Sequence, residues 1–287
     1  MSKVHRIYTR NADYQKLEVL ATNRNKRYRY FEFLVEGVRN INEAIRNDWK
    51  IVSFIYPSGA QLSDWARGIL RDTVTEENIE LEASLMQELS EKEDSSELMA
   101  VVRMREDDVN VLIERPAMNK PYGGKTSSPL YALFDRPSNK GNLGTIIRTL
   151  DALGADGLIL TGHGVDLYDR EVVGATMGSF FSVPVIRMAR HDDLAGFIEL
   201  VKQRYGELNV IGTTAHAELP LSKIDLTAPT LFMIGCETDG LSQGLRPFCT
   251  QLATIPMADT STASSFNVAC ATTVMFYEAI RQRLQYG

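Results

Sequence analysis

The chain has 287 residues, of which 44% are hydrophobic, 24% charged and 8% aromatic. These values exclude a disordered, collagen-like or disulfide-scaffold chain, and the length favours two domains over one. The three cysteines lack metal-ligand spacing, so no metal site is predicted, and the net charge of −6 alone argues against a nucleic-acid partner. Because no segment is apolar enough for a signal core or a membrane span, we expect a cytoplasmic protein without a membrane partner.

Charge is unevenly distributed along the first hundred residues. Residues 1–29 hold eight basic and two acidic side chains, and the run RNKRYRYFEF (24–33) places aromatic rings between the bases. Residues 72–97 hold ten acids and one lysine. A basic, aromatic surface attracts phosphates and stacks on bases, so the first segment is predicted to be either a nucleic-acid-binding extension or a solvated helix face.

The first part of the chain has the pattern of a small α/β domain. Strand-like runs occur at 32–38, 51–57 and 98–104, and a helical stretch occurs at 40–47. Within the acidic segment, one set of apolar residues is spaced for a single helix face. This set is Leu81, Leu85, Met86 and Leu89. The run from 115 to 129 is dense in Pro, Gly, Ser and Lys and is predicted to be a linker.

Beyond residue 130, short apolar runs alternate with helical stretches. The predicted strands lie at 130–135, 157–161, 183–188, 208–214, 230–235 and 252–257. This alternation is typical of an α/β fold, a mostly parallel sheet with helices on both faces. Ligands of such sheets bind beyond the carboxyl ends of the strands, so the loops that follow the strands are the candidate site.

The first unusual loop is DRPSNKGNLGTIIRTLDALGADG (135–157). Asn142 is a good N-cap for a helix that runs to about Leu153, and Arg148 lies beside the apolar stripe of that helix. Arg148 is then either a functional cation or the ion-pair partner of Asp151, three residues further on.

Two more loops follow predicted strands. In MIGCETDGLSQG (233–244), Glu237 sits on a tight glycine turn, where it faces the ligand crevice or caps nearby backbone N–H groups. In IPMADTSTASSFNVAC (255–270), Ser264 or Ser265 is predicted to cap a long terminal helix, whose first N–H groups suit a ligand carboxylate. The predicted packing stripe of that helix is Phe266, Cys270, Thr273, Tyr277, Ile280 and Leu284.

Several enzyme classes lose support because their motifs do not occur in the sequence. No GxGxxG follows the first strand of either half, and GxxxxGK[ST], GxSxG and HExxH are missing. Dinucleotide oxidoreductases, P-loop enzymes, hydrolases with a nucleophile elbow and zinc proteases are therefore disfavoured.

Together, the three loops resemble the motifs of the SpoU/TrmH-type RNA 2'-O-ribose methyltransferases of the SPOUT class. NLGTIIRTLDALGADGLIL resembles the first motif, Asn-x-Gly-x-x-x-Arg, GCETDGLS the second, and IPM…SSFNVA…FYEAIRQR the third. Upstream, EFLVEGVRNINEAI is similar to the ribosomal-protein-like RNA-binding domain often attached to this family. The resemblance implies an RNA substrate-binding domain with a basic amino-terminal extension at 1–114, a linker at 115–129 and a catalytic domain at 130–287.

The resemblance further implies a carboxyl-terminal trefoil knot, S-adenosylmethionine as cofactor, and a homodimer formed through the catalytic domain. The cofactor would contact main-chain groups near Thr213, Gly235, Ile255 and Phe266. The reaction centre would include Asn142, Arg148, Glu237, Ser265 and Asn267. The chain departs from the family pattern at Cys236, at Phe266 and in a longer loop at 258–264.

The activity implied is methyl transfer to a ribose 2'-hydroxyl, with ribosomal RNA as the preferred substrate, because a separate RNA-binding domain suits structured loops. Transfer RNA is the alternative substrate. A non-catalytic RNA-binding protein of the same fold and a dinucleotide-dependent enzyme are the alternative classes. Arg148 acts as the base or as an electrostatic clamp, and a guanidinium pKa above about 12 favours the clamp.

Overall fold

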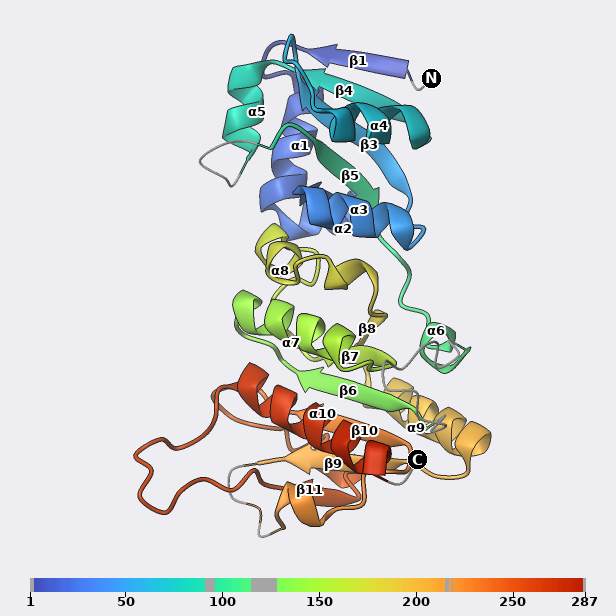
Figure 1. Cartoon of the computed structure of the whole chain (residues 1–287), viewed down its shortest axis with the longest axis vertical. Coiled ribbons are helices and arrows are strands. Elements are labelled where there is room, and N and C mark those ends of the chain that lie inside the picture. Colours follow the sequence, from blue (N-terminus) through green and yellow to red (C-terminus); the bar gives the residue numbers. More distant parts are fainter. Residues whose placement is uncertain (1–2, 91–95, 115–127, 215–216, 218, 286–287) are drawn as a thin grey trace. The chain divides into compact units, whose positions relative to one another are not determined.

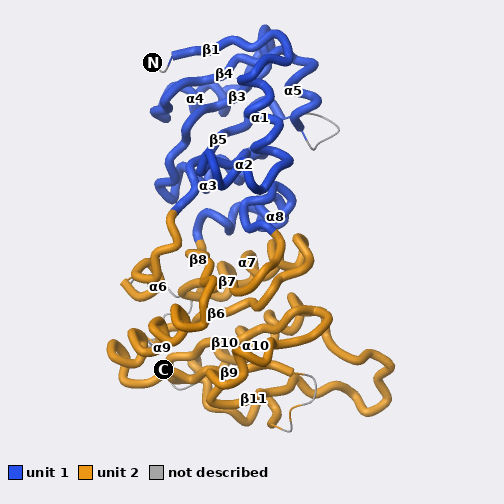
Figure 2. The backbone as a smooth tube through the Cα atoms, turned by 180° about the vertical axis from the view of Figure 1, so that it is seen from behind, with its two compact units in different colours: residues 1–105, 166–182 blue, residues 106–165, 183–287 orange. Residues whose placement is uncertain are grey.

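The protein is described here from a computed structural model, which places residues 3–90, 96–114, 128–214, 217 and 219–285 (Figure 1). The backbone divides into two compact units (Figure 2). Unit 1 comprises residues 1–105 and 166–182, and unit 2 comprises residues 106–165 and 183–287. Among the described helices, none is both long and apolar enough to cross a membrane.

Unit 1 is built on a five-stranded sheet with the strand order β1-β4-β3-β5-β2. Its strands are β1 (Lys3–Ile7), β2 (Glu32–Glu36), β3 (Ile51–Pro57), β4 (Glu77–Leu81) and β5 (Met99–Arg103). β5 runs antiparallel to both of its neighbours, and the other pairs are parallel. The helices are α1 (Ala12–Thr22), α2 (Arg24–Tyr30), α3 (Val38–Arg46), α4 (Asp64–Asp72) and α5 (Ala83–Leu89). A small α/β unit is confirmed.

The described part of the basic segment, residues 3–29, is folded into unit 1 and does not extend from it. β1 pairs in register with β4, and α1 buries Tyr14, Leu17 and Leu20 in the core of the unit. These three residues recur at the spacing of one helix face, which the charge pattern had obscured. The expected extension is therefore corrected to a strand and two helices of the domain itself.

The acidic segment also differs from its predicted single helix. Leu81 ends strand β4, whereas Leu85, Met86 and Leu89 belong to α5, which begins after Glu82. All four apolar side chains are buried in one core cluster. A strand followed directly by a helix thus buries the same four residues as a single helix would. The spacing of the apolar residues alone does not distinguish these two structures.

Unit 1 also contains residues 166–182, which belong to the predicted catalytic domain in sequence. This segment holds α8 (Arg170–Ala175) and the 3-10 turn η1 (Ser179–Phe181). Phe33 of β2 lies 4.9, 5.6 and 6.4 Å, between ring centroids, from Tyr168, Phe180 and Phe181. Aromatic burial of this size is a strong packing contribution, and it explains why the segment joins unit 1.

The compact units therefore do not divide at the predicted linker. The chain passes from unit 1 to unit 2 after Arg105, and it returns to unit 1 for residues 166–182. Of the predicted linker, residues 115–127 lie outside the described part of the chain.

Unit 2 is built on a six-stranded parallel sheet with the order β11-β9-β10-β6-β7-β8. Its strands are β6 (Leu130–Asp135), β7 (Gly157–Thr161), β8 (Val185–Met188), β9 (Asn209–Thr213), β10 (Thr230–Ile234) and β11 (Gln251–Ala253). Its helices are α6 (Asn110–Glu114), α7 (Lys140–Ala152), α9 (His191–Tyr205) and α10 (Val268–Gln285), with the 3-10 turns η2 (Leu221–Lys223) and η3 (Arg246–Phe248). The predicted parallel sheet is confirmed.

Helices cover both faces of this sheet. On one face, Tyr131 of β6 packs against Phe197 of α9, with ring centroids 5.2 Å apart. On the other face, Phe232 of β10 packs against Phe276 of α10 at 5.3 Å, and α7 lies beside α10. Strands buried on both sides need apolar residues at every position, which is why these strands show no alternation in sequence.

The strand order reverses between β6 and β10. β7 and β8 follow β6 outward on one side, whereas β10, β9 and β11 lie on the other side. Phe134 near the end of β6 pairs with Ile234 at the end of β10. Such a reversal leaves a crevice beyond the carboxyl ends of the two central strands.

Candidate functional site

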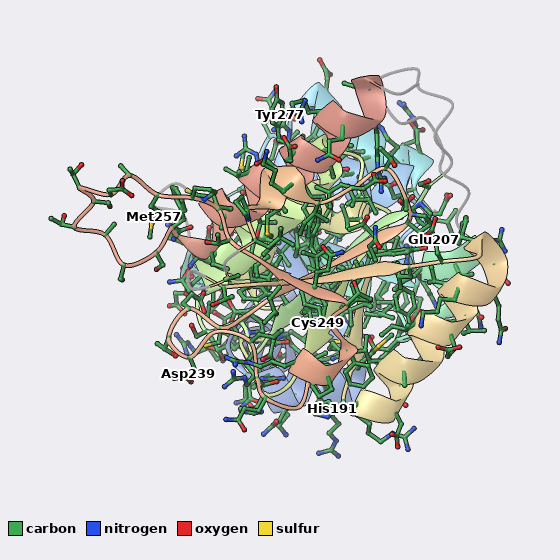
Figure 3. The ribbon with its side chains drawn as sticks, turned by 90° about the horizontal axis from the view of Figure 1, so that it is seen from below. His191, Glu207, Asp239, Cys249, Met257 and Tyr277 are labelled. Carbon is green, nitrogen blue, oxygen red and sulfur yellow. The ribbon has the colours of Figure 1, made fainter. Side chains whose placement is uncertain are left out.

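A cavity of about 820 Å³ opens beyond the carboxyl ends of the strands on this side of the sheet. Its lining includes eight of the nine predicted site residues: Asn142, Thr213, Gly235, Glu237, Ile255, Ser265, Phe266 and Asn267. Figure 3 shows two further lining residues, Asp239 and Met257, on the side of the molecule opposite Glu207, which precedes β9. The three loops singled out by sequence are therefore brought to one cavity.

The first loop presents Asn142 to the cavity because another residue caps the helix. The N-cap of α7 is Asn139, whose Oδ1 accepts the backbone N–H of Asn142 at 2.9 Å. The predicted N-cap was Asn142, and that prediction is wrong by one turn. With the cap supplied by Asn139, the carboxamide of Asn142 is left to make contacts across the cavity.

A network of polar side chains joins the three loops. Asn142 donates from Nδ2 to Oε1 of Glu237 at 3.1 Å, and the Ser138 hydroxyl donates to Oε2 of Glu237 at 2.5 Å. Asn267 donates from Nδ2 to Oδ1 of Asn142 at 3.2 Å. Glu237 thus bridges the first and second loops, and Asn142 joins them to the third. Sequence reasoning did not select Ser138, whose only signal was its place just after a strand.

Glu237 is exposed, yet it is held in its ionised form. Partial desolvation raises the pKa of this carboxyl, but hydrogen bonds from Ser138, from its own backbone and from Asn142 outweigh that effect, so its pKa lies below its ordinary value. A general base works best with a pKa near the working pH. The geometry therefore suits a fixed negative anchor rather than a base.

The second loop makes a tight turn that only glycine permits. A side chain on Gly235 would place its Cβ 2.1 Å from the backbone nitrogen of Leu241. Cys236 and Gly240 exchange two backbone hydrogen bonds, at 3.1 and 3.0 Å, and Gly240 has a φ of +67°. This turn folds back on the end of β10 and forms one wall of the cavity.

The third loop ends in an asparagine cap. α10 begins at Val268, and Oδ1 of Asn267 accepts the backbone N–H groups of Ala269 at 2.9 Å and Cys270 at 3.4 Å. The predicted caps, Ser264 and Ser265, are wrong because they lie in the exposed loop before the helix. Asn267 therefore has two roles, since its Oδ1 caps α10 while its Nδ2 contacts the first loop.

Arg148 is the predicted site residue that does not line the cavity. It lies on the exposed side of α7, and in the described part of the chain its side chain makes no hydrogen bond or ion pair. The expected alternative, a pair with Asp151, is therefore wrong. Within one chain, Arg148 therefore neither pairs with Asp151 nor lies at the cavity, the two positions that the sequence predicted for it.

The apolar stripe predicted to pack α10 is largely exposed. Phe266, Tyr277 and Leu284 are 44%, 60% and 46% exposed, whereas Ile280 is buried. Figure 3 shows Tyr277 at the periphery of the molecule. The helix instead buries a different face, formed by Ala269, Thr272, Met275, Phe276 and Ala279. Both faces of α10 carry apolar residues, so periodicity alone selected the wrong one.

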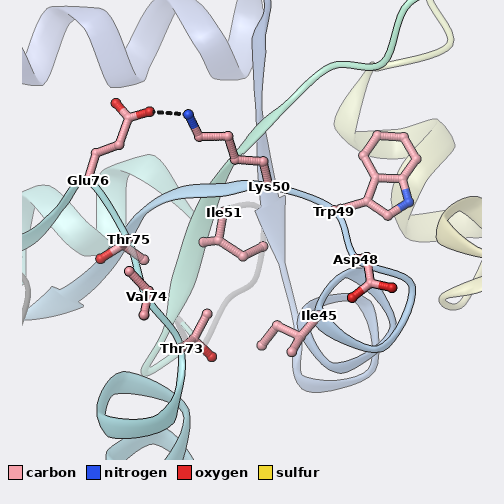
Figure 4. A pocket seen from close by; sticks show the side chains of 9 residues that line it. All are labelled: Ile45, Asp48, Trp49, Lys50, Ile51, Thr73, Val74, Thr75 and Glu76. Carbon is pink, nitrogen blue, oxygen red and sulfur yellow. Dashed lines mark ion pairs between the residues drawn. The ribbon is translucent and has the colours of Figure 1, made fainter.

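A second hollow, of about 420 Å³, lies in unit 1 between α3, β3 and the connection to β4 (Figure 4). Lys50 and Glu76 form an ion pair of 2.6 Å at its rim, above Ile45 and Ile51. None of the predicted site residues lines it. Lys50 and Glu76 neutralise each other at this rim, and the larger cavity of unit 2 is the candidate functional site.

Two family models match the chain. The model of the SpoU rRNA Methylase family matches residues 129–277, and the model of the SpoU L30e-like domain matches residues 11–100. The chain belongs to the SpoU rRNA methylase family. Like the members of that family, it is an S-adenosylmethionine-dependent RNA methyltransferase that acts on a ribose 2'-hydroxyl.

Relatives cover both units. The chain is 41% identical to the 23S rRNA (uridine(2479)-2'-O)-methyltransferase of Streptomyces viridochromogenes, over 97% of this chain and 93% of that protein. The solved structure of the SpoU methyltransferase AviRb from the same organism, in complex with AdoMet, matches with a TM-score of 0.87 and 41% identity, over 96% of this chain and 99% of that one. An AdoMet-bound rRNA methyltransferase from Sinorhizobium meliloti matches with a TM-score of 0.77 and 28% identity, over 97% and 98% of the two chains.

The residues around the cavity suit S-adenosylmethionine. The volume of about 820 Å³ lies in the range of small-molecule sites. Leu252, Ile255 and Phe266 supply apolar surface for a flat base, while Thr213 and the turn after Gly235 supply hydroxyl and backbone groups. An apolar wall with a few polar groups is the arrangement expected for a nucleoside-containing ligand.

Proposed function

We propose that this chain methylates a ribose 2'-hydroxyl of 23S ribosomal RNA. The observation that carries the proposal is the 41% identity to a 23S rRNA uridine-2'-O-methyltransferase over 97% of this chain. That match includes the L30e-like domain. An enzyme of this family with another RNA substrate would be expected to differ from that relative in this domain. A uridine ribose is therefore the expected target, and transfer RNA is the alternative.

The cofactor site is proposed at the cavity of unit 2, with contacts near Thr213, Gly235, Ile255 and Phe266. S-adenosylmethionine supplies a methyl group that its sulfonium already activates. The chain itself then needs to position the ribose, exclude water and stabilise the negative charge that develops on the 2'-oxygen. The turn after Gly235 and the exposed ring of Phe266 both line the cavity and would hold the cofactor.

The polar network at the cavity supports separate roles for its members. Asn142 and Asn267 present carboxamides whose remaining hydrogen-bonding capacity suits a ribose hydroxyl. Glu237 holds the first and second loops together as a carboxylate. Ser265, next to Phe266 in the exposed loop, would contact the ribose or the cofactor once that loop is held.

Arg148 is proposed to act in a homodimer formed through the exposed faces of α7 and α10. Thr149 and Thr273 meet at 3.3 Å where these helices lie side by side, and Tyr277 and Val274 extend an apolar surface from that seam. A second copy of the chain suits this surface because it is apolar, self-complementary by symmetry and part of the catalytic unit. The partner would bring an Arg148 to the cavity, as a positive clamp on the 2'-oxygen and the adjacent phosphate.

The RNA surface of unit 1 is proposed on α2 rather than along the whole basic segment. Arg6, Arg10 and Lys16 are ion-paired with acidic residues of the unit, and Arg27 is buried. The exposed basic and aromatic residues of α2 are Arg24, Arg29 and Tyr30, and Lys26 is half-buried. Exposed cations with a neighbouring ring suit phosphates and unstacked bases.

The proposal includes two further parts, which the family resemblance supports. Residues within 130–287 form a trefoil knot, and the enzyme acts in the cytoplasm, where ribosomal RNA is assembled. The first part is tested by refolding: we expect a slow phase that a prolyl isomerase does not accelerate, because proline isomerisation is the ordinary source of slow refolding.

The deciding experiment is transfer of a labelled methyl group to RNA from cells that lack this enzyme. We expect label in 23S RNA at a single ribose, found by mapping fragments that resist alkaline cleavage, and none with an Asn267→Ala variant. Label in transfer RNA instead would support the alternative substrate. If the chain binds S-adenosylmethionine but labels neither RNA, the proposed substrate is wrong.

A further inference from the structure

We propose that Asp135 is a positioning residue that holds the turn after β10 in the shape the cofactor cavity requires. The proposal rests on the proposed cofactor site in unit 2. Asp135 is the last residue of β6, and it lies beside Gly235 because Phe134 pairs with Ile234 in the sheet. It is 2% exposed and is not part of the cavity lining, so it acts through other residues.

The carboxylate of Asp135 joins three chain segments. Its Oδ2 accepts the backbone N–H of Ser242 at 2.9 Å and Nε of Arg136 at 3.2 Å. Its Oδ1 accepts the hydroxyl of Thr161, at the end of β7, at 3.2 Å. A buried carboxylate is stable only when such donors replace the water that it has lost. The end of the β10 turn is therefore bound to a fixed charge at the switch point of the sheet.

Arg136 carries the same constraint into the turn itself. Its Nη2 donates to the carbonyl of Gly240 at 3.1 Å, and its Nη1 lies 3.5 Å from Oδ2 of Asp239. The backbone of Arg136 has a φ of +50°, a left-handed conformation that a residue with a side chain seldom adopts. A Cβ on Gly162 would lie 2.5 Å from the Arg136 side chain, so the arginine stem is also packed from the β7 side.

The loops are thus held together at two levels. At the exposed level, Glu237 is bound by Ser138 and Asn142. At the buried level, Asp135 binds Ser242 directly and Gly240 through Arg136. The turn after Gly235, which forms the cavity wall, contains both Glu237 and Gly240, and Gly235 itself has no room for a side chain beside Leu241. Loss of the buried level should loosen the wall without removing any group that touches the cofactor or the ribose.

Two substitutions test this role. Asp135→Asn keeps an acceptor for Ser242 but removes the charge that anchors Arg136, and Arg136→Met removes the donor to Gly240. We expect each to raise the dissociation constant and the KM for S-adenosylmethionine by roughly three- to tenfold, with kcat at saturating cofactor within about twofold of wild type. Because both act on one network, the double variant should weaken binding by less than the product of the single effects.

Asp156→Asn is the matched control. Asp156 is also a buried aspartate of unit 2, but its Oδ2 accepts the N–H of Leu130 at 2.7 Å, at the opposite end of β6. We expect it to lower thermal stability while leaving the cofactor dissociation constant within about twofold.

Calorimetric titration with S-adenosylmethionine separates the outcomes. Wild-type affinity in both Asp135→Asn and Arg136→Met would overturn the positioning role, as would an equal loss in Asp156→Asn, because the effect would then reflect stability alone. If the wild-type chain itself did not bind S-adenosylmethionine, the proposed cofactor site would be wrong and this inference with it. If Asp135→Asn does not fold, Arg136→Met decides the matter, since Arg136 is partly exposed and the Asp135 carboxylate keeps the hydrogen bonds from Ser242 and Thr161 when Arg136 is removed.

Discussion

Arg27 and Asp166 form a buried ion pair inside unit 1, although they lie 139 residues apart in the sequence. Nε and Nη2 of Arg27 lie 2.8 and 2.7 Å from Oδ2 of Asp166, and both side chains are at most 5% exposed. Tyr28 donates its hydroxyl to the other carboxylate oxygen at 2.8 Å. The pair fixes residues 166–182, which are part of the methylase family match, to the L30e-like domain.

Removing one member of this pair should be costly. Arg27→Met leaves the Asp166 carboxylate buried without its charge partner, so we expect the free energy of unfolding to fall by about 3–5 kcal/mol. The control is Arg29→Met, an exposed arginine two residues away, for which we expect a change below about 0.5 kcal/mol. Urea unfolding measures both.

The double variant Arg27→Met with Asp166→Leu removes both charges and should recover part of the lost stability. Similar stabilities for the Arg27 and Arg29 variants would show that the ion pair does not hold the segment in place.

The sequence predicted regular elements well wherever burial was complete on both faces. The runs predicted at 51–57, 130–135 and 157–161 coincide with β3, β6 and β7. A short apolar segment bounded by turn residues is typical of a strand buried on both faces, so the first and last residues of the strand can be predicted from the sequence. β1 was missed because it is an exposed edge strand whose basic residues hide the apolar alternation.

The candidate site was also largely predictable, because its residues follow the strands that meet at the switch point. What spacing could not supply was the choice between chemically similar neighbours. Asn139 rather than Asn142 caps α7, and Asn267 rather than Ser265 caps α10. In each case a residue one turn or two positions away begins the helix and caps its first backbone donors, and only the path of the chain decides where the helix begins. The inner contacts of Asp135 depend on three distant segments and left no local pattern.

The lowered pKa of Glu237 predicts how its removal depends on pH. A carboxyl whose pKa is depressed in the folded state stabilises the fold above its unfolded pKa, near 4.5, and that contribution is lost as pH falls through the folded pKa. Glu237→Gln should therefore lower stability by a constant amount, below about 1 kcal/mol because the group is exposed, at all pH values above about 5.5. The difference from wild type should shrink as the pH falls below about 4.5, which thermal melts across pH would measure.

The same substitution separates an anchor from a base. If Glu237 is an anchor, Glu237→Gln should reduce the methyl-transfer rate without changing the shape of the rate profile between about pH 6 and 9. Ser138→Ala is the control, because it removes one hydrogen bond to the same carboxylate and should weaken transfer less. Disappearance of an ionisation from the profile of Glu237→Gln alone would assign it the role of base.

The exposed stripe of α10 predicts the oligomeric state. Tyr277→Asp places a charge in the middle of the apolar surface and should convert the proposed dimer to a monomer of 32.1 kDa in sedimentation equilibrium. Leu200→Asp is the control, since Leu200 is an exposed apolar residue of α9 on the opposite side of the sheet. A Tyr277→Asp protein that sediments like wild type would place the dimer interface elsewhere.

Subunit mixing tests whether Arg148 serves the cavity of the partner. Arg148→Ala and Asn267→Ala should each be nearly inactive alone, because each dimer lacks one component at both cavities. In a heterodimer with one subunit of each variant, the Arg148→Ala subunit has an intact Asn267 at its cavity and receives Arg148 from the Asn267→Ala subunit. One of the two sites of the heterodimer is therefore complete. Random exchange makes half of the dimers mixed, and we expect activity to recover to about a quarter of wild type. Recovery measured by labelled methyl transfer must follow subunit exchange and disappear when either variant also carries Tyr277→Asp. If Arg148 instead served the cavity of its own chain, a complete site would need both Arg148 and Asn267 in the same subunit. Neither variant carries both residues, so no activity would return in the mixed dimer.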